Sequence, residues 1–296
     1  MPPRERTLLP ERLYGILGLP LGHSLSPALH NRLFARLGHA GTYLRWEKQA
    51  GELPSFFQAV RALPIAGLSV TAPYKEAVIP FLDALDPGAR AAGAVNTVYW
   101  KDARLMGGNT DVKGFLAPLA PFSQEGRLPD RALVLGAGGA ARAALTGLQE
   151  LAVSRITVCA RNPLKAEKLA RLFNCALLPW EKRESPLPGD GPLLIINATP
   201  LGMKGCCAEQ SPLSRDCLAL YGARRHKGAG CIVYDLVYNP RPTRLLELAA
   251  LNGLHGLDGL GFFAAQAAGQ LALWTGGRLE GGELPGLVRS LLEDLI

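Results

Sequence analysis

Gly136, Gly138 and Ala141 have the spacing of a turn that binds the pyrophosphate of a dinucleotide. The first glycine permits a tight turn, the second lets the backbone approach the phosphates, and the small third residue allows close helix–strand packing. The turn lies between an apolar run at 131–135, which predicts a buried strand, and residues 140–151, which favour a helix. Because a helix N-terminus offers free N–H groups, this order predicts a nucleotide site; the alternative is a glycine-rich turn in any α/β domain.

The residues after the next predicted strand, at 155–159, indicate which dinucleotide binds. An NAD site needs an acidic residue there to hold the ribose 2′-hydroxyl. Arg161 and Lys165 follow this strand instead, and cations suit a 2′-phosphate. The sequence therefore predicts NADP. The alternative, a solvated basic helix start, is opposed by the helix dipole.

Two serines follow the first predicted strand, at 13–18. Ser24 and Ser26 stand where α/β sheets bind ligands, and two hydroxyls beside a helix N-terminus suit a carboxylate. Ser26 can equally be the N-cap of a helix expected at 27–37, which Pro27 opens and Gly38 ends. Strands at 42–47 and 67–70, with a helix at 53–63 between them, continue a β-α-β alternation that predicts a parallel or mixed sheet.

Small polar residues also lie where later strands of this half are expected to end. Asn96, Asn109, Thr110 and Asp111 indicate either turns or a polar ligand pocket. Lys75, which follows Pro73 before a short helix, has a type and position that are usually solvated. The histidines show no metal-ligand spacing, so no metal site is predicted.

The composition sets the class of protein. A chain of 296 residues with 48% hydrophobic and 19% charged residues is long enough for two globular domains. Its net charge of +7 comes from scattered arginines, with one dense basic run at 224–227, which favours small anionic ligands over nucleic acid. The most apolar segment, 259–274, is too short to cross a membrane, and the N-terminus does not resemble a signal peptide. Six cysteines without C-x-x-C spacing indicate reduced thiols, so a cytoplasmic location is expected.

Taken together, these motifs resemble those of the shikimate dehydrogenase family. The resemblance rests on ordered motifs at 18–31, 70–75, 93–97, 109–111, 136–140, 197–199, 234–238 and at Gln266. It implies a two-domain α/β fold with a cleft between the domains. The substrate domain, at 1–112, would have a mostly parallel sheet and be completed by C-terminal helices in 260–296. The NADP-binding domain, at 113–259, would be of the Rossmann type and doubly wound. The resemblance implies reversible reduction of 3-dehydroshikimate to shikimate, a step of aromatic amino acid biosynthesis, and it leaves a homodimer open.

The resemblance also assigns roles to residues. Lys75 and Asp111 resemble the catalytic pair, in which the lysine protonates the carbonyl oxygen and the aspartate orients the lysine. The implied substrate contacts are Ser24, Ser26, Thr71, Lys75, Asn96, Asp111, Tyr238 and Gln266. The implied cofactor contacts are Gly136, Ala137, Gly138, Gly139, Ala140, Ala160, Arg161, Asn162, Lys165, Thr199, Leu236 and Gly259.

Three segments depart from the family pattern. The family usually has asparagine where Ser69 stands, and it commonly has Asn-Arg-Thr where this chain has Ala160-Arg161-Asn162. The loop at 204–208, with its adjacent cysteines, is also unusual. Two other functions stay open: an NAD-dependent quinate/shikimate dehydrogenase, which would need an acid in place of Arg161, and a non-catalytic ring-acid-binding relative, which would be expected to lose Lys75 or Asp111.

Overall fold

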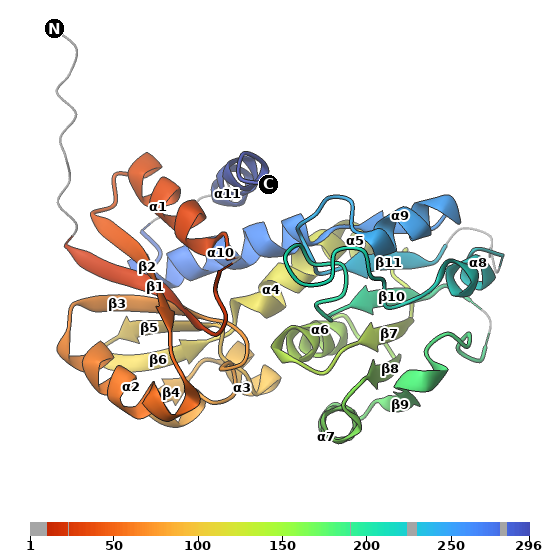
Figure 1. The fold of residues 1–296 in the computed structure, drawn as a ribbon, viewed down its shortest axis with the longest axis horizontal. Coiled ribbons are helices and arrows are strands. Elements are labelled where there is room, and N and C mark those ends of the chain that lie inside the picture. The colour runs from red at the N-terminus through yellow and green to blue at the C-terminus, as the bar shows by residue number, and fades with distance from the viewer. Residues whose placement is uncertain (1–10, 23, 190, 224–229, 279–282) are drawn as a thin grey trace, which may run out of the picture.

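The computed structural model describes residues 11–22, 24–189, 191–223, 230–278 and 283–296. The basic run at 224–227 and His23 lie outside these residues. Within the described residues, no helix combines the length and apolar character needed to cross a membrane. Two six-stranded sheets lie side by side, with helices on their faces and between them (Figure 1).

The first half of the chain forms a mixed sheet. Its strands are β1 (Arg12–Gly18), β2 (Gly41–Glu47), β3 (Ile65–Val70), β4 (Ala84–Leu85), β5 (Thr97–Lys101) and β6 (Arg104–Gly108), and its helices are α1 (Ser26–Arg36), α2 (Leu53–Ala62) and α3 (Pro87–Ala92). The strand order is β2-β1-β3-β5-β6-β4. Strand β1 is parallel to β2 and β3, and β4 is parallel to β6, whereas β5 is antiparallel to both its neighbours. The expected alternation of strands and helices is therefore present, with one hairpin added to it.

The second half forms a fully parallel sheet. Its strands are β7 (Arg131–Leu135), β8 (Arg155–Ala160), β9 (Ala176–Pro179), β10 (Leu194–Asn197), β11 (Ile232–Asp235) and β12 (His255–Leu257). The strand order β12-β11-β10-β7-β8-β9 is the doubly wound order of dinucleotide-binding sheets. The strand that the sequence predicts at 131–135 has these bounds in the structure. Since β7 and β10 are neighbours although β8 and β9 come between them in the chain, the ligand-binding switch point lies between β7 and β10.

The remaining helices pack on and between the sheets. They are α4 (Thr110–Leu116), α5 (Ala120–Gln124), α6 (Gly139–Glu150), α7 (Pro163–Leu172), α8 (Arg215–Ala223), α9 (Arg244–Leu251), α10 (Gly259–Thr275) and α11 (Leu284–Glu293). Helices α4 and α10 are packed together between the two sheets (Figure 1). Their contact is close: a Cβ atom on Gly114 would lie 2.8 Å from the carbonyl oxygen of Phe262.

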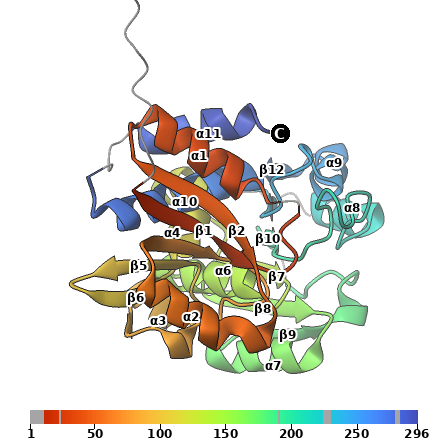
Figure 2. The same ribbon diagram turned by 60° about the vertical axis from the view of Figure 1, so that its left-hand side comes forward.

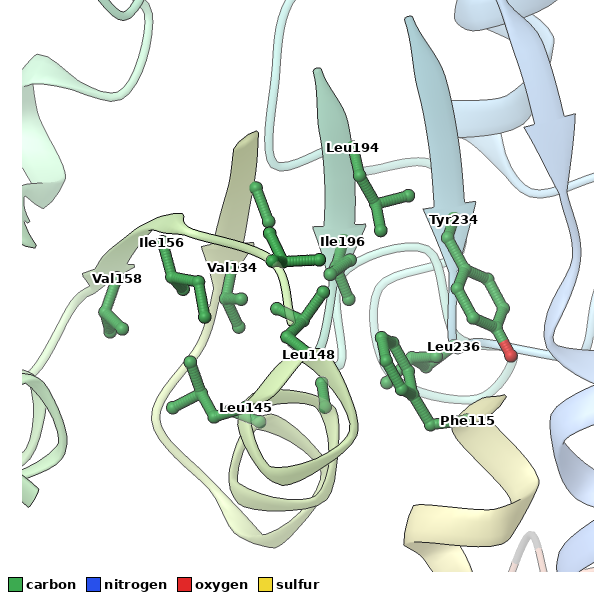
Figure 3. Packing of buried hydrophobic residues seen from close by; sticks show 14 of the residues in the cluster. Phe115, Val134, Leu145, Leu148, Ile156, Val158, Leu194, Ile196, Tyr234 and Leu236 are labelled. Carbon is green, nitrogen blue, oxygen red and sulfur yellow. The ribbon is translucent and has the colours of Figure 1, made fainter. Parts of the chain in front are cut away.

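Separate apolar cores hold the two sheets. Helices α1, α10 and α11 pack on one face of the first sheet, through a core that includes Leu33 and Trp274 (Figure 2). On the second sheet, Leu145 and Leu148 of α6 pack against Val134, while Phe115 of α4 stacks on the ring of Tyr234 (Figure 3). The predicted domain boundary at 112 lies inside α4, which contributes Phe115 to the core of the second sheet.

Candidate active site

The switch point of the second sheet contains the predicted glycine turn. Gly136 follows β7 with φ of +123°, a conformation that favours glycine. A Cβ atom on Gly136 would also lie 2.7 Å from the carbonyl oxygen of Ala198, which follows β10. The turn is therefore pressed against the segment that carries Thr199, so two parts of the predicted cofactor site come together.

The next residues leave room for a ligand at the start of α6. A Cβ atom on Gly138 would meet no atom within 4 Å, so the side of the turn at Gly138 is open. Helix α6 begins at Gly139 with no side chain capping its N–H groups. Ala141 is fully buried in the core beneath the turn, as the small third residue of the fingerprint should be. Free N–H groups beside an open backbone fit a pyrophosphate.

The predicted 2′-phosphate residues lie at the end of β8. Arg161, Asn162 and Lys165 are all exposed at the start of α7. The Oδ1 atom of Asn162 accepts a hydrogen bond from the backbone N–H of Lys165 at 3.0 Å, so this side chain caps α7. The two cations thus flank the capped end of the helix, where the sequence contains no acidic residue.

Lys75 and Asp111 meet although they belong to different elements. The Nζ atom of Lys75, in the loop after β3, lies 2.5 Å from Oδ2 of Asp111, in the first turn of α4. Their side chains are 17% and 5% exposed. A Cβ atom on Gly139 would lie 2.5 Å from Cδ of Lys75, so the lysine stem rests against the glycine turn. The ion pair is therefore adjacent to the predicted cofactor site.

A buried amide fixes the other oxygen of Asp111. The Nδ2 atom of Asn96 donates to Oδ1 of Asp111 at 2.7 Å and is 3.4 Å from Oε1 of Gln266. Its own Oδ1 accepts the backbone N–H of Thr110 at 2.8 Å, which fixes the orientation of the amide. Four of the predicted substrate residues, Lys75, Asn96, Asp111 and Gln266, therefore form one hydrogen-bonded cluster.

A cavity of about 490 Å³ opens between the two sheets. The predicted site residues that line it are Ser24, Thr71, Ala140, Thr199, Leu236 and Tyr238. The cluster around Asp111 is not part of this lining, and the two are joined by the 71–75 loop, where Tyr74 donates a backbone hydrogen bond to Thr71 at 2.9 Å. The structure thus divides the predicted substrate contacts between a cavity and an adjacent polar cluster, except for Ser26, which is in neither.

Tyr238 and the Ser24–Ser26 segment meet on one side of the cavity. The ring of Tyr238 stacks on Phe263 with centroids 4.4 Å apart, and burial raises the pKa of its hydroxyl although the backbone of Leu25 opposes that shift. Ser26 is not the N-cap of α1, and this expectation was wrong. The helix begins one residue earlier than expected, so Leu25 is the cap and Ser24 Oγ accepts the N–H of Ser26 at 3.3 Å.

Ser69, where the family usually has asparagine, belongs to a buried hydrogen-bond chain. Its hydroxyl accepts from Tyr43 at 2.6 Å and donates to Oε1 of Gln270 at 2.9 Å. The amide of Gln270 then donates to the backbone oxygen of Asn96 at 3.0 Å. Through Gln270, Ser69 is therefore linked by hydrogen bonds to the backbone of Asn96.

Sequence reasoning missed two polar contacts near the site. Glu76 pairs with Arg142 of α6 at 2.8 Å, which joins the 71–76 loop to the second sheet. Asn197 donates to Asp235 at 2.9 Å and accepts from Thr199, which links the ends of β10 and β11. Burial raises the pKa of Asp235 to about 6 despite its hydrogen bonds. The motifs at 197–199 and 234–238 could have indicated the contact between Asn197 and Asp235. No local pattern indicates the pair of Glu76 with Arg142.

The unusual loop carries two neighbouring thiols. The Sγ atoms of Cys206 and Cys207 lie 2.9 Å apart, and Cys207 donates to the backbone oxygen of Pro200 at 2.9 Å. All six cysteines are free thiols. Lys204 of this loop and Met203 just before it line the cavity, so the loop forms part of the cavity wall.

Comparison with known proteins identifies the family. A sequence profile described as the shikimate dehydrogenase substrate binding domain matches residues 16–98. The chain is 43% identical over 284 residues to the shikimate dehydrogenase (NADP(+)) of Oleidesulfovibrio alaskensis, a match that covers 96% of this chain and 97% of the relative. It is 44% identical over 269 residues to the protein of the same name from Pelobacter propionicus, with 90% and 92% covered.

A solved structure agrees with these matches. The shikimate 5-dehydrogenase of Thermus thermophilus, crystallised with NADP(H) and shikimate, superposes with a TM-score of 0.77 at 35% identity, covering 96% of this chain and 100% of that one. The doubly wound sheet and the glycine turn described above agree with this likeness. The chain is therefore a member of the shikimate dehydrogenase family of NADP-dependent oxidoreductases.

Proposed function

We propose that this protein reversibly reduces 3-dehydroshikimate to shikimate with NADPH, and that Lys75 and Asp111 are its catalytic pair. The observation that carries the proposal is the 2.5 Å ion pair between these residues, held against Gly139 of the cofactor turn. The names of the relatives, and the NADP(H) and shikimate in the Thermus thermophilus structure, support the same reaction.

The cofactor residues follow from the open turn and the basic helix start. The proposed pyrophosphate site is formed by residues 136–140, and the proposed 2′-phosphate site by Arg161, Asn162 and Lys165, together with Ala160, the last residue of β8. Thr199, Leu236 and Gly259 would lie beside the nicotinamide end. NADPH, when bound there, supplies the hydride that the ring carbonyl carbon accepts. We propose residues 113–259 as the cofactor-binding domain.

The proton comes from the chain itself. Negative charge develops on the carbonyl oxygen as the ketone is reduced, and a donor within about 3 Å must meet it. The Lys75 ammonium would donate this proton, while Asp111, held by Asn96, keeps the ammonium in place. The Asn96 amide holds one oxygen of the Asp111 carboxylate, so the other oxygen can position the lysine without moving.

The substrate would lie over the first sheet. We propose that Ser24, Ser26 and the Tyr238 hydroxyl bind the ring carboxylate, since Ser24 and Tyr238 line one side of the cavity and the backbone N–H of Ser26 donates to Ser24 Oγ. Thr71, Asn96 and Gln266 would bind the ring hydroxyls. A site built from such hydrogen bonds rejects ring acids that lack the matching groups. Residues 1–112, with the helices in 260–296, are the proposed substrate domain.

The test is steady-state oxidation of NADPH, and separately of NADH, by the purified protein with 3-dehydroshikimate. We expect fast turnover with NADPH and a much lower kcat/KM with NADH. Quinate with NAD⁺ serves as the comparison substrate. Preference for NADH and quinate would overturn the assignment of Arg161, and absence of turnover with either cofactor would favour a ring-acid-binding protein.

A further inference from the structure

Arg45 lies beside the proposed carboxylate site without belonging to it by resemblance. It is near the end of β2, it is exposed, and its side chain lines the cavity together with Ser24 and Tyr238. Its Nη2 atom donates to the backbone oxygen of Ser24 at 3.0 Å. This bond places the guanidinium next to the segment whose hydroxyls would meet the ring carboxylate.

The guanidinium of Arg45 has N–H donors that are not used in hydrogen bonds with the described residues. Arginine carries five N–H donors, and among the described residues Arg45 makes this one side-chain hydrogen bond, to a neutral oxygen, and no ion pair. Glu47, two residues further along the strand and so on the same face, accepts the backbone N–H of Leu21 at 2.5 Å instead. The charge of Arg45 is therefore not neutralised by a neighbouring carboxylate in the part of the chain that the structure describes.

The cavity as a whole has one sign of charge. Its described lining contains two cations, Arg45 from the first sheet and Lys204 from the loop after β10, and no carboxylate. A cavity lined in this way attracts an anion and weakens the binding of a neutral ligand of the same shape. Arginine in particular pairs with carboxylates through two parallel N–H bonds.

We propose that Arg45 is a specificity-determining residue that binds the carboxylate of the ring-acid substrate, beside Ser24 and Tyr238. The proposal rests on the proposed function, because it takes the anion in the cavity to be the substrate. It adds a charged partner to a site that otherwise recognises the carboxylate through hydroxyl groups. The same guanidinium holds the Ser24 backbone, so the carboxylate and the loop that binds it share one cation.

The experiment separates binding of the charge from support of the loop. Shikimate and its uncharged methyl ester are oxidised with saturating NADP⁺ by the wild type, by Arg45→Gln, and by a matched control, Arg36→Gln. Arg36 is exposed in the last turn of α1 and does not line the cavity. We expect R45Q to raise KM for shikimate by about 10- to 100-fold, with KM for the ester changed less than about threefold. R36Q should leave both values unchanged.

Other outcomes overturn the proposal. Equal loss for the acid and the ester would make Arg45 a support for the Ser24 loop only. If NADP⁺ is then varied at saturating shikimate, a raised KM for NADP⁺ with an unchanged KM for shikimate would assign the guanidinium to a cofactor phosphate. Calorimetric titration of shikimate into the wild type and R45Q makes the same comparison without turnover. An inactive wild type that still binds shikimate through Arg45 would therefore overturn the proposed function and leave this inference standing.

Discussion

Glu76 and Arg142 form a 2.8 Å ion pair that joins the loop of the proposed catalytic lysine to the helix of the proposed cofactor-binding turn. Glu76 directly follows Lys75, and Arg142 stands one turn into α6. The arginine side chain is 5% exposed and the glutamate side chain 47%. The two partners therefore differ in burial. Loss of the glutamate would leave a buried guanidinium without its carboxylate, which is costly.

Glu76→Gln should therefore lower the free energy of unfolding. Since Glu76 is half exposed, we expect a loss of about 1 kcal/mol, below the value for a fully buried pair. Urea unfolding followed by far-UV circular dichroism measures it. Glu125→Gln, which removes an exposed pair with Arg127, is the control and should cost little. Equal shifts in the two variants would show that burial of Arg142 contributes nothing.

Lys75→Ala should reduce kcat by about 10²- to 10⁴-fold and change KM for 3-dehydroshikimate by less than about threefold. The reason is that the hydrogen bond from Lys75 to the carbonyl oxygen strengthens in the transition state. Lys113→Ala, an exposed lysine in α4, is the control. A variant with normal kcat and weak substrate binding would contradict the proton-transfer role.

Arg161→Gln should raise KM for NADPH by about 10- to 100-fold and leave KM for NADH nearly unchanged, since only NADPH carries the 2′-phosphate. The matched control is Arg171→Gln, at the other end of α7, where the arginine is exposed and lies 3.9 Å from Glu167. Parallel losses for both cofactors would assign Arg161 to the pyrophosphate or to the helix instead.

His30 should make the protein less stable in weak acid. Its ring is fully buried against Tyr43, neither ring nitrogen has a hydrogen-bond partner among the described residues, and burial lowers its pKa to about 3, a shift that the nearby Gln270 only partly opposes. The unfolded chain therefore binds one more proton between about pH 3 and 6.5. The stabilising contribution is complete above pH 6.5 and is lost as the pH falls, by at most about 1.4 kcal/mol per unit.

Thermal unfolding between pH 4.5 and 8 tests this slope in the wild type and in His30→Phe. The phenylalanine cannot be protonated, so its stability should fall less on acidification than that of the wild type. His255→Phe, at an exposed histidine that contacts Phe122, should keep the wild-type slope. If His30→Phe retained the full slope, the acid sensitivity would come from other groups.

The sequence predicts local features of this protein better than distant ones. The turn at Gly136 could be predicted because the strand, the glycines and the helix are adjacent in the chain, and their chemistry is local. The proximity of Lys75 and Asp111, 36 positions apart, was expected only from the family resemblance. The partners of Ser69 depend on how α10 packs on the first sheet, and the pair of Glu76 with Arg142 depends on how the two halves pack, so no local pattern indicated them. The binding and catalytic roles of the site residues remain predictions.

The packing of α10 limits when the first sheet can finish folding during synthesis of the chain. Strands β1 to β6 are made first, yet their core includes Trp274, whose indole N–H donates to the backbone oxygen of Val98 at 3.0 Å. All strands of the second sheet have been made once Leu257 is added, before α10 begins. Domains generally fold from the N-terminus as they emerge from the ribosome. In this chain one face of the sheet that is translated first is covered by one of the last helices, so that sheet cannot finish folding before the strands of the second sheet have been made.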